Sequence, residues 1–317
     1  MSALKVIVSE INEAAEGVRH FTLVNADGGE MPSFSGGSHV VVSMPASGRT
    51  YRNAYSLLSN PSDRRNYQIA VRLQENSRGG SKFMHEQVGI GMTLDISWPV
   101  NLFDLSRLGH KHILIAGGIG ITPFMSQAHE LLRQGKDFEL HYAYRSPRHA
   151  AFLEFLREQL GDRLHCYDQS QGKTLNFETL FSHQPLGTHA YVCGPAGMVE
   201  AMIGTARRLG WPEGHIHNEE FLAPPVGEPF TIRLRKSQMD VEVGAEVSML
   251  EAMEAAGVDA PYLCRGGACG RCELEVLYTD GVLDHHDHYL SDEERRSGKK
   301  IMPCVSRARC SFIELNL

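Results

Sequence analysis

Four cysteines near the C-terminus constrain the fold of this chain more than any other feature. Cys264, Cys269 and Cys272 follow the spacing C-x4-C-x2-C, and Cys304 comes further downstream. Thiolates are soft anionic ligands, and four of them complete the coordination of two sulfide-bridged irons. The residues between the first three cysteines are mostly small, so the backbone can come close to the sulfides. The spacing therefore predicts a segment folded around a plant-type [2Fe–2S] cluster.

Zinc is the alternative ligand for four cysteines. Zinc ligands usually come as two short pairs, whereas here three are clustered and the fourth is distant, which favours the cluster. The chain has seven cysteines, an odd number that does not suit a disulfide framework. The N-terminal residues also lack the apolar stretch of a signal peptide. We therefore expect a cytoplasmic protein.

Composition excludes several other classes of protein. The formal charge of −7 argues against non-specific nucleic-acid binding, which needs a basic face. No apolar run approaches the length of about 18 residues that a membrane-spanning helix needs. The length of 317 residues exceeds one ordinary core, so we expect several domains.

Periodicity divides the chain into three domains. Residues 1–105 contain short alternating stretches separated by Gly, Ser and Pro, which predicts an antiparallel β-barrel or sandwich. In residues 106–222 apolar strands alternate with helical stretches, which predicts an α/β domain with a parallel sheet. Residues 223–229 are rich in Pro and Gly and are interpreted as a linker. Residues 230–317 form the small domain that carries the four cysteines.

Two motifs in the first domain suit a flavin. Arg52, Tyr55 and Ser56 could supply a cation for a phosphate, an aromatic wall and a hydrogen-bond donor. By itself this pattern is weak, since strands with these residues are common. Arg78-Gly79-Gly80-Ser81 precedes an expected helix over residues 82–88. Free N–H groups at a helix N-terminus bind phosphate.

A glycine-rich turn opens the second domain. Gly117, Gly118 and Gly120 directly follow an expected strand, and Thr122 and Pro123 begin an expected helix. Glycine permits a pyrophosphate to approach a helix N-terminus closely. Thr122 could cap that helix, and Pro123 suits its first turn. The motif departs from the G-x-G-x-x-G fingerprint of dinucleotide-binding folds, and a plain strand-to-helix turn is the alternative.

These motifs together resemble a known family. Residues 230–317 resemble a plant-type ferredoxin domain with an α+β (β-grasp) fold, and the glycine turn resembles the G-G-x-G-x-x-P variant of ferredoxin reductases. The order of flavin, nicotinamide and ferredoxin domains is that of the phthalate dioxygenase reductase family, and the resemblance covers the whole chain. It implies FMN as the flavin, although the residues themselves fit FMN and FAD equally.

The resemblance also implies roles for individual residues. Asp168 resembles the aspartate that binds the adenosine ribose and so favours NADH, whereas Arg145 could tolerate the phosphate of NADPH. Phe221 is a candidate for the aromatic residue on the nicotinamide face of the flavin, with a core phenylalanine as the alternative. The residues implied for flavin or nicotinamide are Arg52, Tyr55, Ser56, Leu57, Arg78, Gly79, Gly80, Ser81, Gly117, Gly118, Gly120, Thr122, Pro123, Arg145, Asp168, Cys193, Gly194, Pro195, Met198 and Phe221; of these, Ser56, Cys193 and Phe221 are expected at the reacting atoms.

The expected activity is electron transfer from NADH through FMN and the [2Fe–2S] cluster. By resemblance the acceptor is the terminal oxygenase of a two-component Rieske system, which docks transiently. Another one-electron acceptor, such as a cytochrome or a diiron hydroxylase, is the first alternative, and an electron-carrier or redox-sensing module is the second. From Pro229 to Leu317 there are 15 acidic and 11 basic residues, a net charge of −4, which suggests a basic patch on the partner.

Overall fold

The structure is a computed structural model that describes residues 3–46, 49–75, 77–221 and 224–317. The chain divides into two compact units, Met1–Glu220 and Phe221–Leu317, which are described separately. Leu222 and Ala223, where we expect the second domain to end and the linker to begin, lie outside the described residues. The three domain boundaries therefore stay predictions.

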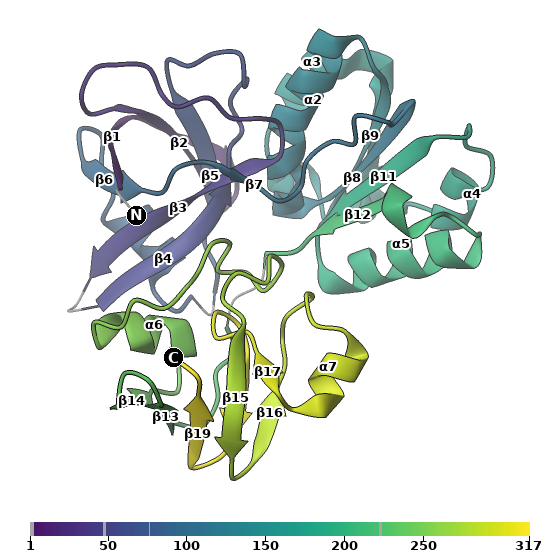
Figure 1. Cartoon of the computed structure of the whole chain (residues 1–317). Coiled ribbons are helices and arrows are strands. Elements are labelled where there is room, and N and C mark those ends of the chain that lie inside the picture. The colour runs from purple at the N-terminus through teal and green to yellow at the C-terminus, as the bar shows by residue number, and fades with distance from the viewer. Residues whose placement is uncertain (1–2, 47–48, 76, 222–223) are drawn as a thin grey trace. The chain divides into compact units, whose positions relative to one another are not determined.

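The first unit begins with an antiparallel sheet in the strand order β4-β3-β6-β1-β2-β5, and β7 pairs with β3 (Figure 1). Its core contains Phe21, Val40, Val42, Tyr67 and Met84. The elements are β1 (Leu4–Ala15), β2 (Val18–Asn25), β3 (Ser38–Ala46), β4 (Arg49–Ser56), β5 (Tyr67–Arg72), α1 (Gly80–Glu86), β6 (Thr93–Ile96) and β7 (Val100–Asn101).

The prediction of an antiparallel sheet is confirmed, but a closed barrel is not formed by the described residues. β4 and β5 are the two ends of the sheet and do not pair with each other there. The short helix α1 contacts β3, β4 and β5, so it packs where pairing between the two ends would close the barrel.

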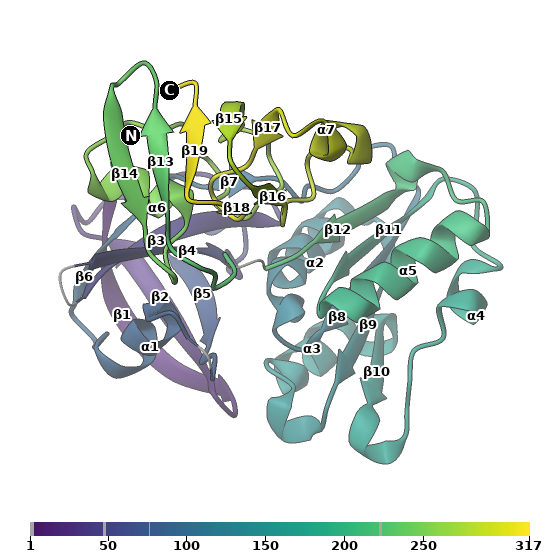
Figure 2. The same ribbon diagram turned by 90° about the horizontal axis from the view of Figure 1, so that it is seen from below.

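The second part of this unit is a parallel sheet in the order β10-β9-β8-β11-β12. Figure 2 shows α2 and α3 on one face and α4 and α5 on the other. The central strands β8 and β11 are buried almost throughout, as expected for strands covered on both faces. The elements are β8 (Lys111–Gly117), α2 (Thr122–Gln134), β9 (Asp137–Tyr144), α3 (Leu153–Leu160), β10 (Leu164–Asp168), α4 (Phe177–Phe181), β11 (Thr188–Cys193), α5 (Ala196–Arg208) and β12 (Ile216–Glu219), with short 3-10 turns at Gly118–Ile121, Pro147–His149, Gly161–Arg163, Gln169–Gln171 and Glu213–His215.

Buried hydrogen bonds join the two sheets of the first unit. Gly36 N–H donates to Glu130 Oε2 at 2.7 Å, and Gly37 N–H donates to Ser126 Oγ at 3.1 Å. Gln127 Nε2 donates to the carbonyl of Phe103 at 2.6 Å. The acceptor or donor side chains all lie on α2, so this helix fixes the parallel sheet against the antiparallel sheet.

The second unit is a small α+β domain. Its sheet has the order β14-β13-β19-β15-β17, in which β13 and β19 are parallel, and β16 pairs with β18. Capping boxes of Ser248 with Glu251 and of Ser291 with Glu294 begin α6 and α7. The elements are β13 (Phe230–Leu234), β14 (Met239–Val243), α6 (Met249–Ala255), β15 (Leu274–Thr279), β16 (Val282–Asp284), α7 (Asp292–Ser297), β17 (Lys300–Ile301), β18 (Arg307–Arg309) and β19 (Phe312–Leu315).

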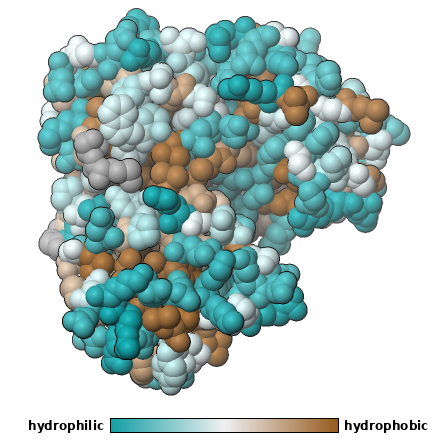
Figure 3. Space-filling model, viewed as in Figure 1, coloured by the Kyte–Doolittle hydropathy of each residue, from teal (hydrophilic) through white to brown (hydrophobic). Residues whose placement is uncertain are grey.

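The surface shown in Figure 3 is mostly hydrophilic, and hydrophobic residues gather on it in separate patches. Among the described residues, none of the helices combines the length and the apolar character needed to cross a bilayer.

Candidate functional site

A cleft of about 410 Å³ lies in the first unit, at the carboxyl ends of the parallel strands. The strand order reverses between β8 and β11, and ligands of open α/β sheets bind at such a switch point. Glu16, Val18 and Arg72 contribute to the lining from the antiparallel sheet. Of the predicted nicotinamide residues, those that line the cleft are Gly117, Gly118, Arg145, Pro195 and Met198.

The glycine-rich turn at the end of β8 is in direct contact with a second turn at Gly194 and Pro195, two other residues predicted for the nicotinamide. A Cβ placed on Gly120 would lie 2.2 Å from the carbonyl oxygen of Cys193, so only glycine fits. Pro123 stands in the first turn of α2, as predicted. The expectation that Thr122 caps α2 is wrong: a 3-10 turn precedes the helix, so the cap position falls on Ile121, and the Thr122 hydroxyl donates to the carbonyl of Ile119 at 3.0 Å.

Cys193 is a buried thiol at the end of β11. Only 1% of its surface is exposed, and burial raises its pKa well above the usual range. A neutral, enclosed thiol is a poor nucleophile but a good packing group beside a ligand. The structure therefore supports positioning by Cys193 and not covalent chemistry.

Glu219 is a functional candidate that sequence reasoning missed. It lies on β12 directly beside Cys193 in the sheet register. Burial raises the pKa of its carboxyl to about 8, and Oε2 has no hydrogen-bond partner among the described residues. A carboxyl group in this state is protonated at neutral pH and can donate a proton. The sequence shows that an acidic residue lies near the end of the domain, but it does not show that the carboxyl group is enclosed.

Asp168 is the last residue of β10, and Arg145 directly follows the neighbouring strand β9. Asp168 is buried, and its Oδ1 accepts hydrogen bonds from Ser170 N at 3.0 Å and Ser170 Oγ at 2.6 Å. It therefore holds the turn at Gln169–Gln171, and its neighbours Tyr167 and Gln169 line the cleft. Arg145 lines the cleft itself.

The flavin residues predicted on one strand lie on β4 and just after it. Ser56 is 5% exposed, and its hydroxyl has no partner among the described residues. Burial raises the pKa of Tyr55 to about 12, and Asn53 Nδ2 donates to its hydroxyl at 3.2 Å. Leu57 is fully buried in the core of the antiparallel sheet. An orphaned buried hydroxyl next to an aromatic side chain fits a group that hydrogen-bonds a flavin.

The glycine motif predicted for the flavin phosphate packs against the same strand. Helix α1 begins at Gly80, two residues before the predicted start. Gly79 has φ of 130°, and a Cβ there would lie 2.3 Å from the ring of Tyr51. Ser81 Oγ donates to Ser77 Oγ at 2.9 Å and accepts from Gln74 N at 3.2 Å. Arg78, which directly precedes these residues, is half-buried.

The four predicted cluster cysteines converge in the second unit. Cys264, Cys272 and Cys304 are buried, and all four thiols are free of disulfides. The sulfurs of Cys272 and Cys304 lie 3.3 Å apart, although 32 residues separate them in the chain. Cys264 is hydrogen-bonded to Cys269. The fold thus brings the four cysteine sulfurs together in one place.

The loop around these cysteines stabilises negative charge on sulfur. A hydrogen bond from Cys269 lowers the pKa of Cys264 to about 5, and backbone N–H groups of the loop add to this effect. Gly266 N–H donates to Cys264 Sγ at 3.4 Å. Four cysteine sulfurs in one region, with N–H groups directed at Cys264, fit an iron–sulfur cluster, which would bind all four as thiolates.

Comparison with known proteins supports this assignment. The model of the "2Fe-2S iron-sulfur cluster binding domain" matches residues 232–309. The model of the "Dimethylamine monooxygenase subunit DmmA-like, N-terminal domain" matches residues 99–216.

Similar proteins cover nearly the whole chain. A carnitine monooxygenase reductase subunit of Acinetobacter pittii is 46% identical, over 95% of this chain and 98% of that protein. The heme-dependent oxidative N-demethylase beta subunit of Ectopseudomonas mendocina is 47% identical, over 99% of each chain. The solved structure of phthalate dioxygenase reductase, described as "a modular structure for electron transfer from pyridine nucleotides to [2Fe-2S]", superimposes with a TM-score of 0.88 and 32% identity, over 100% of this chain and 98% of that one. The chain therefore belongs to the phthalate dioxygenase reductase family and is an oxidoreductase with a flavin-binding antiparallel sheet, a nicotinamide-binding parallel sheet and a [2Fe–2S] ferredoxin domain.

Proposed function

We propose that this protein takes electrons from NADH and delivers them one at a time to the terminal component of a two-component oxygenase or demethylase. The observation that carries the proposal is the four-thiolate site in the same chain as the cleft at the switch point. A protein that moved only hydride would need no one-electron centre. When bound, FMN would supply an acceptor for the two electrons of a hydride and the [2Fe–2S] cluster an acceptor for single electrons, so the protein could turn a two-electron donor into a one-electron donor.

The residues of β4 and the α1 turn hold the flavin in this proposal. The unpartnered hydroxyl of Ser56 donates a hydrogen bond to the ring system, and Tyr55 forms its wall. The phosphate lies at the start of α1, against Gly80 and Ser81, with Arg52, Arg78 and Gly79 around it. Leu57 follows Ser56 and packs in the core behind the ring system. Ser81 Oγ already has two partners, so its backbone N–H is the group left for the phosphate.

The two glycine turns bind the nicotinamide nucleotide. Gly117, Gly118 and Gly120 let the pyrophosphate approach, and Gly194, Pro195 and Met198 form the opposite side, because the two turns touch. Thr122 and Pro123 fix the start of α2 behind them. Asp168 binds the adenosine ribose through Oδ2, since Oδ1 is engaged by Ser170, and this choice favours NADH over NADPH. Arg145 lines the cleft and contacts the nucleotide phosphate.

Cys193 is the proposed thiol of the reacting centre. It is neutral and enclosed, so it positions the nicotinamide ring without reacting with it. Phe221 remains the proposed aromatic residue for the nicotinamide face of the flavin, and its side chain is 50% exposed. In this proposal the four ligands of the cluster are Cys264, Cys269, Cys272 and Cys304.

A Rieske-type terminal oxygenase is the proposed partner, docked transiently in the cytoplasm. Relatives named as reductase subunits of monooxygenases and as vanillate O-demethylase oxidoreductases support an oxygenase acceptor. The net charge of −4 on residues 229–317 supports a basic docking patch on that partner, and the chain's overall charge of −7 supports the expectation that nucleic acid is not a partner. A haem protein is a second candidate, because one relative at 47% identity is named as a subunit of a heme-dependent N-demethylase.

The test is to supply the protein and NADH to two purified acceptors, the oxygenase component of carnitine monooxygenase and the haem component of the N-demethylase. Product formed per NADH is measured at increasing salt. A high yield of product per NADH with the oxygenase component, and a low yield with the haem component, supports the Rieske proposal. A high yield with the haem component alone supports the haem candidate. NADH oxidation without product from either acceptor contradicts the proposed partner class. A rate independent of salt contradicts the charged docking patch.

A further inference from the structure

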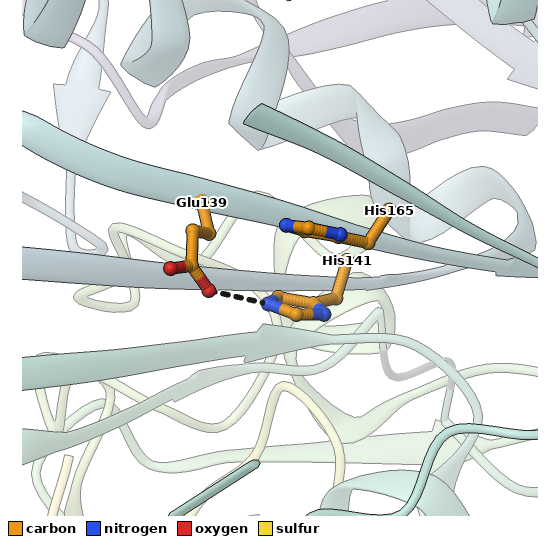
Figure 4. A group of neighbouring side chains, drawn as sticks. All are labelled: Glu139, His141 and His165. Atoms are coloured by element: carbon orange, nitrogen blue, oxygen red, sulfur yellow. Dashed lines mark hydrogen bonds and ion pairs between the residues drawn. The ribbon is translucent and has the colours of Figure 1, made fainter. Parts of the chain in front are cut away.

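Three metal-ligating side chains meet on the face of the parallel sheet that points away from the core of α2 and α3. Glu139 and His141 are two residues apart on β9, so both point to the same face, and His165 lies directly opposite His141 on β10. Figure 4 shows the Glu139 carboxylate directed at the ring of His141, with His165 stacked beside it. This Glu139–His141–His165 group lies outside the cluster cysteines and outside the residues assigned to the flavin or nicotinamide.

The spacing of the group is close to that of a metal site. One ligand atom from each of the three residues lies within 4.8 Å of the other two. Glu139 Oε2 and His141 Nε2 are 3.2 Å apart. Tetrahedral zinc with ligands at about 2.0–2.1 Å places its ligand atoms ~3.3 Å apart, so this pair already has the required separation. His165 must move by up to ~1.5 Å to complete the same geometry, and its exposed position on the edge strand β10 permits that movement.

The surrounding groups hold these ligands in position. His141 is buried on β9, with 4% of its surface exposed. Its Nδ1 is held by the hydroxyl of Tyr167 at 2.9 Å, like the outer hydrogen bond that orients metal-bound histidines. Lys111 Nζ holds Glu139 Oε1 at 2.6 Å and leaves Oε2 on the side of the histidines. The Lys111 ammonium repels a cation and limits the affinity.

We propose that Glu139, His141 and His165 bind one divalent zinc ion on the surface of the nicotinamide domain, with water as the fourth ligand. Two histidines and a carboxylate are a common ligand set for zinc with one open position. The ion would join the edge strand β10 to β9. Tyr167, the partner of His141, also lines the cleft, so the ion would stiffen one wall of the nicotinamide site.

The test titrates zinc chloride into the complete protein with its flavin and cluster, by isothermal calorimetry and by metal analysis after dialysis. The visible absorbance of the cluster is followed at the same time, because zinc could otherwise displace iron at the four cysteines. The variants are His165→Ala, which changes an exposed side chain, and Glu139→Gln, which keeps the shape of the side chain. His183→Ala is the matched control, because it removes another exposed histidine of the same domain.

The proposal predicts one zinc per chain in the wild type and in His183→Ala, with unchanged cluster absorbance. Loss of a residue that only hydrogen-bonds a ligand lowers the affinity for the metal by about 10–100-fold. Loss of a direct ligand should therefore lower the affinity for zinc at least ~10-fold in both test variants. The proposal is overturned if the wild type binds no stoichiometric zinc. It is also overturned if His165→Ala and Glu139→Gln bind zinc as tightly as the control does.

Discussion

Replacing Glu254 by glutamine tests how the loop around the cluster cysteines is held in place. Arg265 follows the first of these cysteines, and its guanidinium donates to both oxygens of Glu254 on α6, at 2.7 Å and 2.5 Å. The two side chains are only 5% and 13% exposed. The ion pair therefore ties the cluster loop to a helix away from bulk water.

The expected cost follows from that burial. Removing one partner of a buried ion pair leaves an uncompensated charge and costs about 3–5 kcal/mol. Glutamine keeps one acceptor oxygen, so we expect the lower end, about 3 kcal/mol. With a urea dependence of ~1–3 kcal/mol per molar, the midpoint of unfolding should fall by ~1–3 M.

The assay follows the visible absorbance of the cluster in urea, because that signal reports the second unit alone. Asp240→Asn is the matched control, since it breaks the exposed ion pair of Arg233 and Asp240 in the same unit. An exposed pair contributes at most about 1 kcal/mol, so the midpoint of the control should shift several-fold less. Adding Arg265→Met to Glu254→Gln removes the stranded charge and should restore part of the lost stability.

Equal midpoints for Glu254→Gln and Asp240→Asn would refute the reasoning, because the buried pair would then contribute no more than a surface pair. Failure of the double variant to recover any stability would show that packing, and not the stranded charge, causes the loss.

Three further predictions concern the first unit. Gly120→Ala places a Cβ against the carbonyl of Cys193, and overpacking of this kind costs about 1–3 kcal/mol. The Kd for NADH should therefore rise by ~10-fold or more, while the flavin content stays constant. An unchanged Kd in a binding titration would contradict the contact. Ser56→Ala removes a buried hydroxyl without a partner among the described residues; stopped-flow reduction of the flavin by NADH should slow at least ~10-fold at equal flavin content. Because burial raises the pKa of Glu219 from 4.5 to about 8, the folded protein holds that proton more tightly than the unfolded chain. Stability should therefore fall as pH rises from about 4.5 to about 8 and then level off. Glu219→Gln should flatten the plot of Tm against pH. Parallel plots for the variant and the wild type would show that the Glu219 carboxyl does not cause the pH dependence of stability.

Local patterns predicted most of the elements that position the site. The strand before Gly117 and the helix that begins at Thr122 and Pro123 form where their apolar periodicity indicates. The cluster spacing was equally informative, because the metal chemistry restricts which cysteines can share a site. Patterns of this kind predict the structure correctly because they depend on residues that are close together in the sequence.

Features that depend on distant parts of the chain could not be predicted in the same way. The contact of Gly120 with Cys193 requires the pairing of β8 with β11, which no local pattern specifies. The enclosure of the Glu219 carboxyl arises from the pairing of β12 with β11, which places it beside Cys193, and the four residues of β12 carry no clear periodicity. The open edge between β4 and β5 likewise depends on where α1 packs.

The most direct test of the electron path is an anaerobic titration of the purified protein with NADH, followed by visible absorbance and low-temperature EPR. We expect loss of the flavin absorbance together with the signal of a reduced [2Fe–2S] cluster. Loss of the flavin absorbance without a cluster signal, when dithionite does produce that signal, would contradict transfer of electrons from the nicotinamide site to the four-cysteine site.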